Sequence, residues 1–291
     1  MFKTLGLIRP INLIIIILTM MVFQFYFYTH PDGSPLFSLV WMLKVVVMIA
    51  LAASGNVIND FFDQNVDLSN GRYNAIAMKD LSVNKALVLY GLILSVSFFG
   101  SLGLYQLTNS LFYLFVNMVM AFGLFLYTPI FKKTIWLGNI WVAACLSFVP
   151  IWTLWGNPLF QINSDLFIWT ITFALFAFFI NWNREIIKDV QDAEGDKSNG
   201  CHSIFLRYGM TKTMNIIRFI FALNALLTLF FMISENQKMI SIILLGGIVF
   251  LPSIFLFFKT KYWLQKGKVQ LLSHYLKIWM AISVFVFLSI P

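Results

Sequence analysis

The chain has 291 residues, of which 60 % are hydrophobic, 18 % are aromatic and only 11 % are charged. About a quarter of the residues of a soluble globular protein are charged, so a water-soluble fold is excluded and lipid must be the solvent for much of the surface. The net charge of +8 is then explained by basic cytoplasmic loops rather than by a nucleic-acid partner. Two cysteines, Cys145 and Cys201, provide neither a disulfide framework nor the spacing of a metal site.

Apolar segments along the chain predict helices long enough, or nearly so, to cross a bilayer core of about 30 Å. The first segment follows Lys3 and Arg9 as in a signal sequence, but it is long and lacks a small-residue cleavage site, so we interpret it as a retained helix. We expect an all-α, polytopic bundle of about nine transmembrane helices with cytoplasmic cap loops, forming one domain over residues 1–291. The nine segments are 11–29, 38–58, 84–106, 110–131, 135–155, 166–186, 213–233, 239–258 and 273–290.

The basic residues of the loops predict the orientation of this bundle. With the N-terminus inside, one set of loops contains nearly all of the loop lysines and arginines, and the opposite set contains only Lys238. This asymmetry predicts a cytoplasmic N-terminus and a C-terminus on the opposite side of the membrane. The two longest inside loops, after the second and sixth helices, are therefore expected on the same face.

Acidic residues concentrate in these two loops. Nine of the twelve fall in two windows, and each window contains the spacing D-x-x-D-x-x-x-D. On a helix, offsets of 0, 3 and 7 lie within an arc of about 60° and span about 10 Å, so we expect each motif to form one stripe on a helix that extends out of the bilayer. The aspartates are Asp60, Asp63 and Asp67 in the first motif and Asp189, Asp192 and Asp196 in the second.

Three like charges on one stripe repel one another unless a cation lies between them. Mg²⁺ is the natural candidate, because it takes oxygen ligands and is commonly bound by carboxylates together with substrate phosphates. Two facing stripes would hold two or more Mg²⁺ ions bridged by a diphosphate. The alternative, a solvated helix extension with partners such as Arg184 and Lys188, explains a single cluster better than a symmetric pair.

Basic residues on the same face complete a candidate diphosphate-binding site. Metal ions and cationic donors that meet the charge growing on a departing diphosphate would supply most of the catalysis. Each of these residues is also explained by the positive-inside rule, and Arg184 is the best candidate because it lies at the membrane boundary beside the carboxylates. The candidates are Arg72, Lys132, Lys133, Arg184, Lys188 and Lys197.

At these residues the sequence resembles the UbiA-type intramembrane prenyltransferases. That family is marked by N-D-x-x-D-x-x-x-D after the second helix and by a motif like R-E-x-x-x-D-x-x-D-x-E-G-D after the sixth. Residues 59–67 and 184–196 match these two motifs, and residues 127–134 are similar to the family's Tyr…Lys stretch. The resemblance spans nearly the whole chain.

The resemblance implies a bundle with a central cavity that is open sideways to lipid and capped by the motif loops. It implies that Asn59 and the six aspartates bind a Mg²⁺-diphosphate, and that an allylic cation is captured by a lipophilic acceptor. The substrates would be a polyprenyl diphosphate and either a quinone-type aromatic compound or geranylgeranylglyceryl phosphate. Residues 70–75 depart from the family's N-R-P-x-R-P-like stretch and keep only Arg72 as a phosphate contact, which leaves the acceptor open.

Two other functions are compatible with parts of the sequence. A divalent-cation transporter or channel would use the acidic clusters as a metal pathway, but its carboxylates are expected near the bilayer midplane. A non-catalytic relative that only binds lipid is disfavoured by the intact carboxylates. No obligate protein partner is evident.

Lys44 and Arg218, within or near predicted spans, are expected to extend toward the membrane interfaces.

Overall fold

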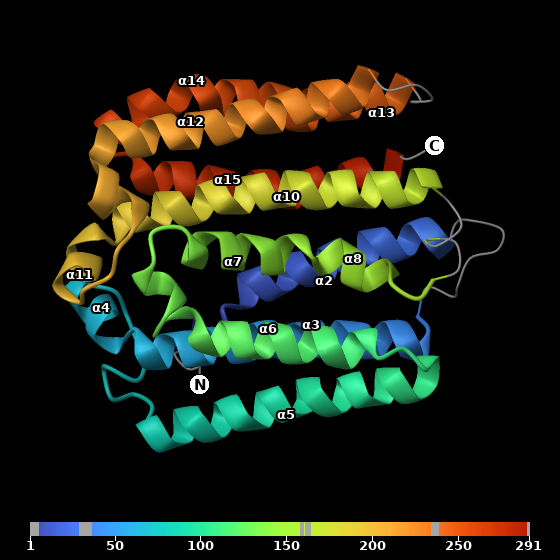
Figure 1. Ribbon diagram of the computed structural model, residues 1–291, viewed down its shortest axis with the longest axis horizontal. Coiled ribbons are helices and arrows are strands. Elements are labelled where there is room, and N and C mark those ends of the chain that lie inside the picture. Colours follow the sequence, from blue (N-terminus) through green and yellow to red (C-terminus); the bar gives the residue numbers. More distant parts are fainter. Residues whose placement is uncertain (1–5, 29–36, 158–159, 161–163, 234–238, 290–291) are drawn as a thin grey trace.

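The computed structural model describes residues 6–28, 37–157, 160, 164–233 and 239–289, and every regular element in these ranges is helical. The helices lie side by side along one axis (Figure 1). The elements are η1 (Gly6–Ile8), α2 (Pro10–Tyr28), α3 (Leu39–Phe62), α4 (Gln64–Ser69), α5 (Val83–Thr108), α6 (Phe112–Tyr127), η2 (Phe131–Lys133), α7 (Leu137–Ser147), α8 (Val149–Leu154), α10 (Ser164–Gln191), α11 (Ala193–Ser198), α12 (Ile204–Ile233), α13 (Met239–Leu244), the π-helix η3 (Leu245–Phe250), α14 (Leu251–Gln265), α15 (Val269–Ser283) and η4 (Val284–Ser289).

Each of the nine predicted apolar segments corresponds to a described helical crossing. Seven crossings are long and apolar enough to span a membrane, and α2 and α6 are shorter apolar helices. One crossing combines α7 with α8, and another combines α13, η3 and α14. The expected all-α, polytopic membrane bundle is therefore confirmed.

The outer surface of the bundle is apolar, as a lipid solvent requires. Helix α5 packs against α3 on one side. Its other side exposes large side chains, with Val88, Leu92 and Phe99 each more than half accessible. A contiguous apolar surface of this kind is stable in hydrocarbon and would cause aggregation in water.

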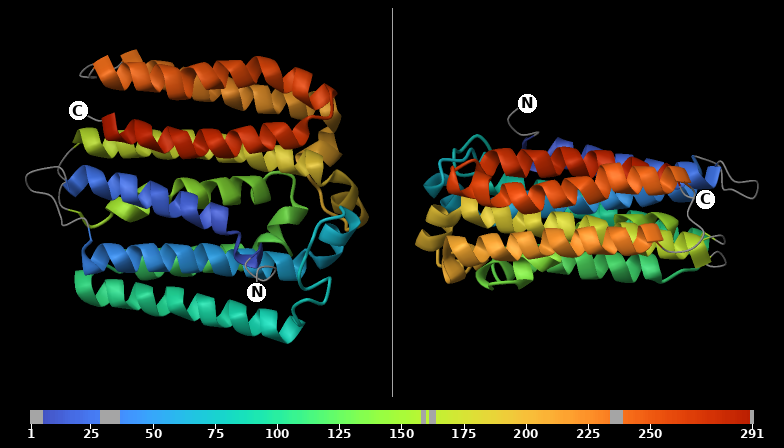
Figure 2. Two further views of the ribbon diagram at one scale, coloured as in Figure 1. Left: turned by 180° about the vertical axis from the view of Figure 1, so that it is seen from behind. Right: turned by 90° about the horizontal axis from the view of Figure 1, so that it is seen from above.

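The interior is divided between two groups of packed helices. One group, from α2, α3, α6 and α8, surrounds Tyr113 and Trp152. The other, from α10, α12, α14 and α15, surrounds Phe221 and Leu272. From behind, α2 lies between α3 and α15 (Figure 2). The motif helices α3 and α10 therefore belong to different halves, and their ends meet where the halves join.

Lys44 occupies a different place from the one expected. The sequence predicts that its side chain extends to the outer interface, but the residue is only 6 % exposed. Its ammonium group donates hydrogen bonds to the carbonyl oxygens of Thr153 at 2.9 Å and Trp155 at 2.7 Å. These carbonyls lie at the C-terminal end of helix α8, where the last backbone oxygens lack intrahelical donors, so a cation there is favoured by the helix dipole.

Candidate active site

Both motif helices are interrupted at the middle aspartate of the motif. Helix α3 ends before Asp63, whose φ and ψ are −87° and 9°, and α4 begins directly after it. Helix α10 ends before Asp192, with φ and ψ of −100° and 3°, and α11 follows in the same way. The expected continuous stripe is thus wrong in detail: each motif is bent at its centre, which turns the short helices α4 and α11 over the end of the bundle (Figure 1).

The two short helices contact each other, as the predicted meeting of the motifs requires. Gly195 makes this contact close, because a Cβ atom built there would lie 2.4 Å from Asn70 Nδ2 and 2.7 Å from the carbonyl oxygen of Val66. The Gly195 amide donates to Asn70 Oδ1 at 2.9 Å, and Asn70 Nδ2 donates to the Asp192 carbonyl at 3.3 Å. The two halves of the bundle are therefore joined at the motifs by the Asn70 side chain, which bonds the backbone of Asp192 and Gly195.

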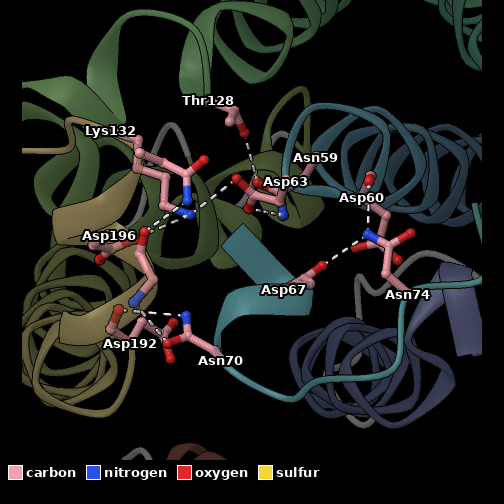
Figure 3. A network of polar contacts seen from close by, with 12 residues as sticks. Asn59, Asp60, Asp63, Asp67, Asn70, Asn74, Thr128, Lys132, Asp192 and Asp196 are labelled. Atoms are coloured by element: carbon pink, nitrogen blue, oxygen red, sulfur yellow. Dashed lines mark hydrogen bonds and ion pairs between the residues drawn. The ribbon is translucent and has the colours of Figure 1, made fainter. Parts of the chain in front are cut away.

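Lys132 lies between the two motifs (Figure 3). Its ammonium group donates a hydrogen bond to Asp63 Oδ1 at 2.9 Å and lies 3.7 Å from Asp196 Oδ1. Asn59 donates to Asp63 Oδ2 at 3.0 Å and accepts a hydrogen bond from the hydroxyl of Thr128 at 2.9 Å. A second bridge joins Arg72, from the loop after α4, to Asp192, with Nη1 and Oδ2 at 2.7 Å.

The other two carboxylates of the first motif are held by residues that the sequence analysis did not single out as their partners. Arg9 donates to Asp60 Oδ1 at 2.8 Å, which places the beginning of α2 at this end of the bundle. The buried Asn74 donates to Asp67 Oδ2 and to the Asp60 carbonyl, both at 2.8 Å. These contacts fix the loop after α4 against the end of α3 (Figure 3).

In the second motif, Asp189 accepts a hydrogen bond from Asn139 of α7 at 2.8 Å. One turn earlier, Glu185 is paired with Arg184 at 2.8 Å and with Lys188 at 2.6 Å. The structure thus places Arg184 and Lys188 around Glu185 and not on the aspartates. Asn139 gave no signal in the sequence, because a single amide in an apolar segment resembles any packed polar residue.

Two predicted basic residues lie at the edge of the site. Lys133 and Lys197 are exposed, and neither forms an ion pair with a described residue. Exposed lysines keep their hydration and add only a long-range positive field. The structure therefore brings Lys132 and Arg72 into contact with the carboxylates and leaves Lys133 and Lys197 beside them.

Burial controls the electrostatics of this end of the bundle. It raises the pKa of the Asp196 carboxyl to about 6, against the opposing charge of Lys132. Burial also raises the pKa of Asp67 and Asp192. Burial alone would lower the pKa of Lys132, but the charges of Asp63 and Asp196 raise it above its ordinary value. The site is a cluster of partly desolvated carboxylates that attracts cations strongly.

The residues fit a divalent metal together with an anionic substrate. Among the described residues, no three His, Cys, Asp or Glu side chains are close enough to hold a metal by themselves, because Lys132 and Arg72 lie among the carboxylates. Oδ1 of Asp196 is nevertheless buried and accepts no hydrogen bond within the described ranges, whereas Oδ1 of Asp192 is in contact with Arg72 Nη2. Oxygen donors with free lone pairs suit Mg²⁺, which commonly takes its remaining ligands from water and phosphate.

A cavity of about 70 Å³ begins near this site and extends into the membrane region. It is formed by α2, α8, α10 and α15, with α7 contributing Leu146. Its polar residues are Asn12, Thr19, Asn181, Arg184, Lys277 and Ser283. A second space of about 10 Å³ shares Phe173, Ala177 and Ser283 with the first and is otherwise lined by apolar side chains.

Lys277 was not among the site residues predicted from the sequence. A lysine inside an apolar segment of a membrane protein is unusual, so its position in the sequence alone would have indicated a functional residue. The structure shows its place, since it lines the cavity together with Arg184 of another helix.

Comparisons with known proteins agree with this geometry. A family model described as the UbiA prenyltransferase family matches residues 15–281. The digeranylgeranylglyceryl phosphate synthase of Saccharolobus solfataricus is 30 % identical over 218 residues, covering 72 % of this chain and 71 % of that protein.

Two solved structures share the fold. A structure of digeranylgeranylglyceryl phosphate synthase matches with a TM-score of 0.67 at 23 % identity, covering 99 % of this chain and 98 % of the other. A UbiA homolog from Archaeoglobus fulgidus, bound to DMAPP and Mg²⁺, matches with a TM-score of 0.65 at 17 % identity, covering 97 % and 99 %. The expected resemblance is confirmed: the chain belongs to the UbiA prenyltransferase family.

Proposed function

We propose that this protein transfers a prenyl group from a polyprenyl diphosphate to the hydroxyl group of a glyceryl phosphate lipid, with Mg²⁺ as cofactor. The observation that carries the proposal is the junction of the two aspartate motifs, where Lys132 lies between Asp63 and Asp196. A site of this kind, with carboxylates for metal and cations for phosphate, matches a Mg²⁺-diphosphate in both of its charges.

The six motif aspartates are proposed to hold the metal ions, and Asn59 is proposed to contact the diphosphate. Bound Mg²⁺ would neutralise the diphosphate and favour its departure. In the absence of metal, Lys132 and Arg72 pair with the motif carboxylates. They are therefore already placed to donate hydrogen bonds to diphosphate oxygens when the metal binds. Lys133 and Lys197, at the exposed edge, are proposed to attract the anionic substrate and to hold its outer oxygens.

The transfer follows from these contacts. The bond between C1 of the prenyl chain and the diphosphate oxygen breaks, and its electron pair leaves with the diphosphate. The acceptor hydroxyl oxygen forms the new bond to C1 and passes its proton to the departing diphosphate. Lys132 and Arg72 stabilise the charge that develops on the departing oxygen, in a region where burial strengthens each contact.

The choice of a glyceryl phosphate acceptor over a quinone-type aromatic compound is supported by relatives. The synthase of Saccharolobus solfataricus is named for the product digeranylgeranylglyceryl phosphate. The alternative of a divalent-cation transporter or channel is less well supported. Both acidic motifs lie at one end of the bundle and are paired with lysine and arginine, which would oppose the passage of a cation.

Two further expectations accompany this function. We propose that residues 1–291 form one transmembrane domain, with the motif end and the N-terminus on the cytoplasmic side and the C-terminus on the other side. The excess of basic residues in the motif-side loops supports this orientation. Protease protection of a tag placed at either terminus, in sealed vesicles of known orientation, tests it.

The decisive experiment is a transfer assay with purified protein, Mg²⁺ and radiolabelled geranylgeranyl diphosphate against glyceryl phosphate and aromatic acceptors. The wild-type protein should label the glyceryl phosphate lipid, and Asp63→Asn and Asp192→Asn should each lose at least about a hundredfold in kcat/KM. Asp165→Asn is the matched control, because Asp165 is exposed near the opposite end of α10. Full turnover in either motif variant, or labelling of aromatic acceptors alone, would contradict the proposal.

A further inference from the structure

The polar part of the cavity between α2, α10 and α15 contains an excess of positive charge. Arg184 and Lys277 both line it. The charge of Lys277 interacts with those of Arg184, Arg9 and Glu185. Arg9 is already paired with Asp60, and Glu185 is shared by Arg184 and Lys188. Arg184, Lys188 and Lys277 therefore have only the carboxylate of Glu185 between them. This leaves a net charge of about +2 in a partly buried region.

Several groups in this place lack partners. Arg184 is 7 % exposed, and its Nε donates no hydrogen bond to any described residue. Oδ1 of Asn181, also lining the cavity, is buried and equally unsatisfied in the described ranges. Lys277 makes no ion pair with a described residue. Buried polar groups without partners are costly, so the unpartnered donor of Arg184 and acceptor of Asn181 beside a cavity point to a ligand that both accepts and donates hydrogen bonds, as a phosphate monoester with a hydroxyl group does.

The size and charge of the space indicate which ligand. The cavity volume of about 70 Å³ is several times the roughly 10–15 Å³ that one water molecule requires. The cavity therefore has room for a tetrahedral oxyanion. A phosphate monoester has a charge of about −1.5 to −2 at neutral pH, which balances the excess positive charge. Deeper in the membrane the lining becomes apolar, at Ile180, Ala177 and Phe173, as the hydrocarbon part of a lipid requires.

The cavity also lies at a suitable distance from the diphosphate site. Glu185 precedes Asp189 by one helical turn, or about 6 Å along α10. Lys188, which donates to Glu185 at 2.6 Å, directly precedes Asp189 of the second motif, so the two places adjoin. In a glyceryl phosphate the free hydroxyl lies one carbon from the phosphoester carbon. An anion held at Arg184 would thus place that hydroxyl toward the prenyl C1.

From these observations we infer that Arg184 and Lys277, which line the cavity, form a second anion site beside the diphosphate site that binds the phosphate monoester of the lipid acceptor, with Lys188 adding its charge from its contact with Glu185. The inference rests on the proposed transferase function and specifies the acceptor's chemical class. Lys277 is a specificity-determining residue, because it has no counter-ion of its own among the described residues and gains one only when a phosphorylated acceptor is bound. A non-phosphorylated acceptor of the same shape would leave it unpaired.

The test compares Lys277→Gln with the wild type on two acceptors, a prenyl ether of glycerol phosphate and the same ether without phosphate. We expect KM for the phosphorylated acceptor to rise about tenfold or more, as the loss of one charge-assisted hydrogen bond predicts. KM for prenyl diphosphate, and turnover of the non-phosphorylated ether, should be unchanged. Lys277→Arg should restore the lower KM, and Lys268→Gln, an exposed substitution just before α15, should have no effect.

Binding provides a readout that does not need turnover. Thermal stabilisation of the metal-free protein by the phosphorylated ether, in EDTA, should be present in the wild type and in Lys277→Arg and absent in Lys277→Gln. Equal stabilisation of all three overturns the inference while leaving the transferase function intact. Stabilisation that depends on Lys277 without transfer to any acceptor would instead reject the proposed function and keep the anion site. A matching size-exclusion profile shows that each variant is folded.

Discussion

The contact between α11 and α4 offers a sharp test of whether the two motifs must meet, through the substitution Gly195→Ala. The added Cβ would lie 2.7 Å from the Val66 carbonyl oxygen and 2.4 Å from Asn70 Nδ2, whereas ordinary contact begins at 3.4 Å. The Asn70 side chain can rotate away, but the backbone oxygen cannot. Helix α11 must therefore move from α4 by about 0.7 Å, carrying Asp192 and Asp196 away from the first motif.

A displacement of about 1 Å in a catalytic arrangement costs on the order of a hundredfold in rate, so we expect kcat to fall about tenfold to a hundredfold. Overpacking of this kind costs about 1–3 kcal/mol of stability, which leaves a membrane bundle folded. The measurement is kcat for prenyl transfer in detergent at saturating Mg²⁺, with size-exclusion chromatography to verify folding.

Two further variants complete this experiment. Gly91→Ala is the matched control, since a Cβ there meets nothing within 4 Å and the change stabilises a helix interior. Asn70→Ala combined with Gly195→Ala should not restore activity, because the overlap with the Val66 carbonyl persists. If Gly195→Ala retains kcat within about twofold of the wild type, the requirement for a close junction is refuted.

Three other predictions concern separate parts of the molecule. Lys44→Met, which removes two hydrogen bonds to the end of α8, should lower the free energy of unfolding by about 1–3 kcal/mol, seen as a lower Tm with unchanged kcat of the folded fraction. Because the Asp196 carboxyl has a pKa of about 6 without metal, it is ionised above pH 6 and protonated below; calorimetry from pH 5 to 8 should show Mg²⁺ affinity falling as the pH drops through 6. Arg72→Ala should raise KM for prenyl diphosphate about tenfold with little loss of Tm, because the Arg72 side chain is 43 % exposed and water partly screens its ion pair; an unchanged KM would exclude Arg72 from the diphosphate site.

Much of the architecture could be predicted from the sequence. Successive apolar segments cross the bilayer in alternating directions, so their order fixes which ends lie together. Four crossings, an even number, separate the end of the second helix from the end of the sixth. The two aspartate motifs, after the second and sixth helices, were therefore expected at one end of the bundle. The contact of α4 with α11 confirms this expectation.

The bend of each motif was not predictable from spacing. Aspartates at offsets of 0, 3 and 7 fit a straight helix, and Asp63 and Asp192 are compatible with either a helical or a bridging conformation. The bend depends on what lies opposite, namely the close approach of Gly195 to Asn70. This contact joins residues more than a hundred positions apart, which local patterns do not report.

The polar residues inside the bundle were the hardest to assign. A lysine in an apolar segment can extend to the interface or pair inside, and only the packing of its neighbours decides. Lys44 bonds the end of α8, and Lys277 lines a cavity beside Arg184. Asn74 and Asn139 bond motif carboxylates and were missed, because neither belongs to a charge pattern.

The central claim, that both motifs grip one ligand, is tested most directly by a double-mutant cycle on Mg²⁺-dependent binding of inorganic pyrophosphate, measured by calorimetry. Asp63→Asn and Asp192→Asn should each weaken binding about a hundredfold. The double variant should bind little more weakly than either single variant, because either substitution alone already prevents the two motifs from binding the ligand together. Losses that multiply to about ten-thousandfold, or wild-type affinity in either single variant, would show that the two carboxylates act independently and would contradict the account.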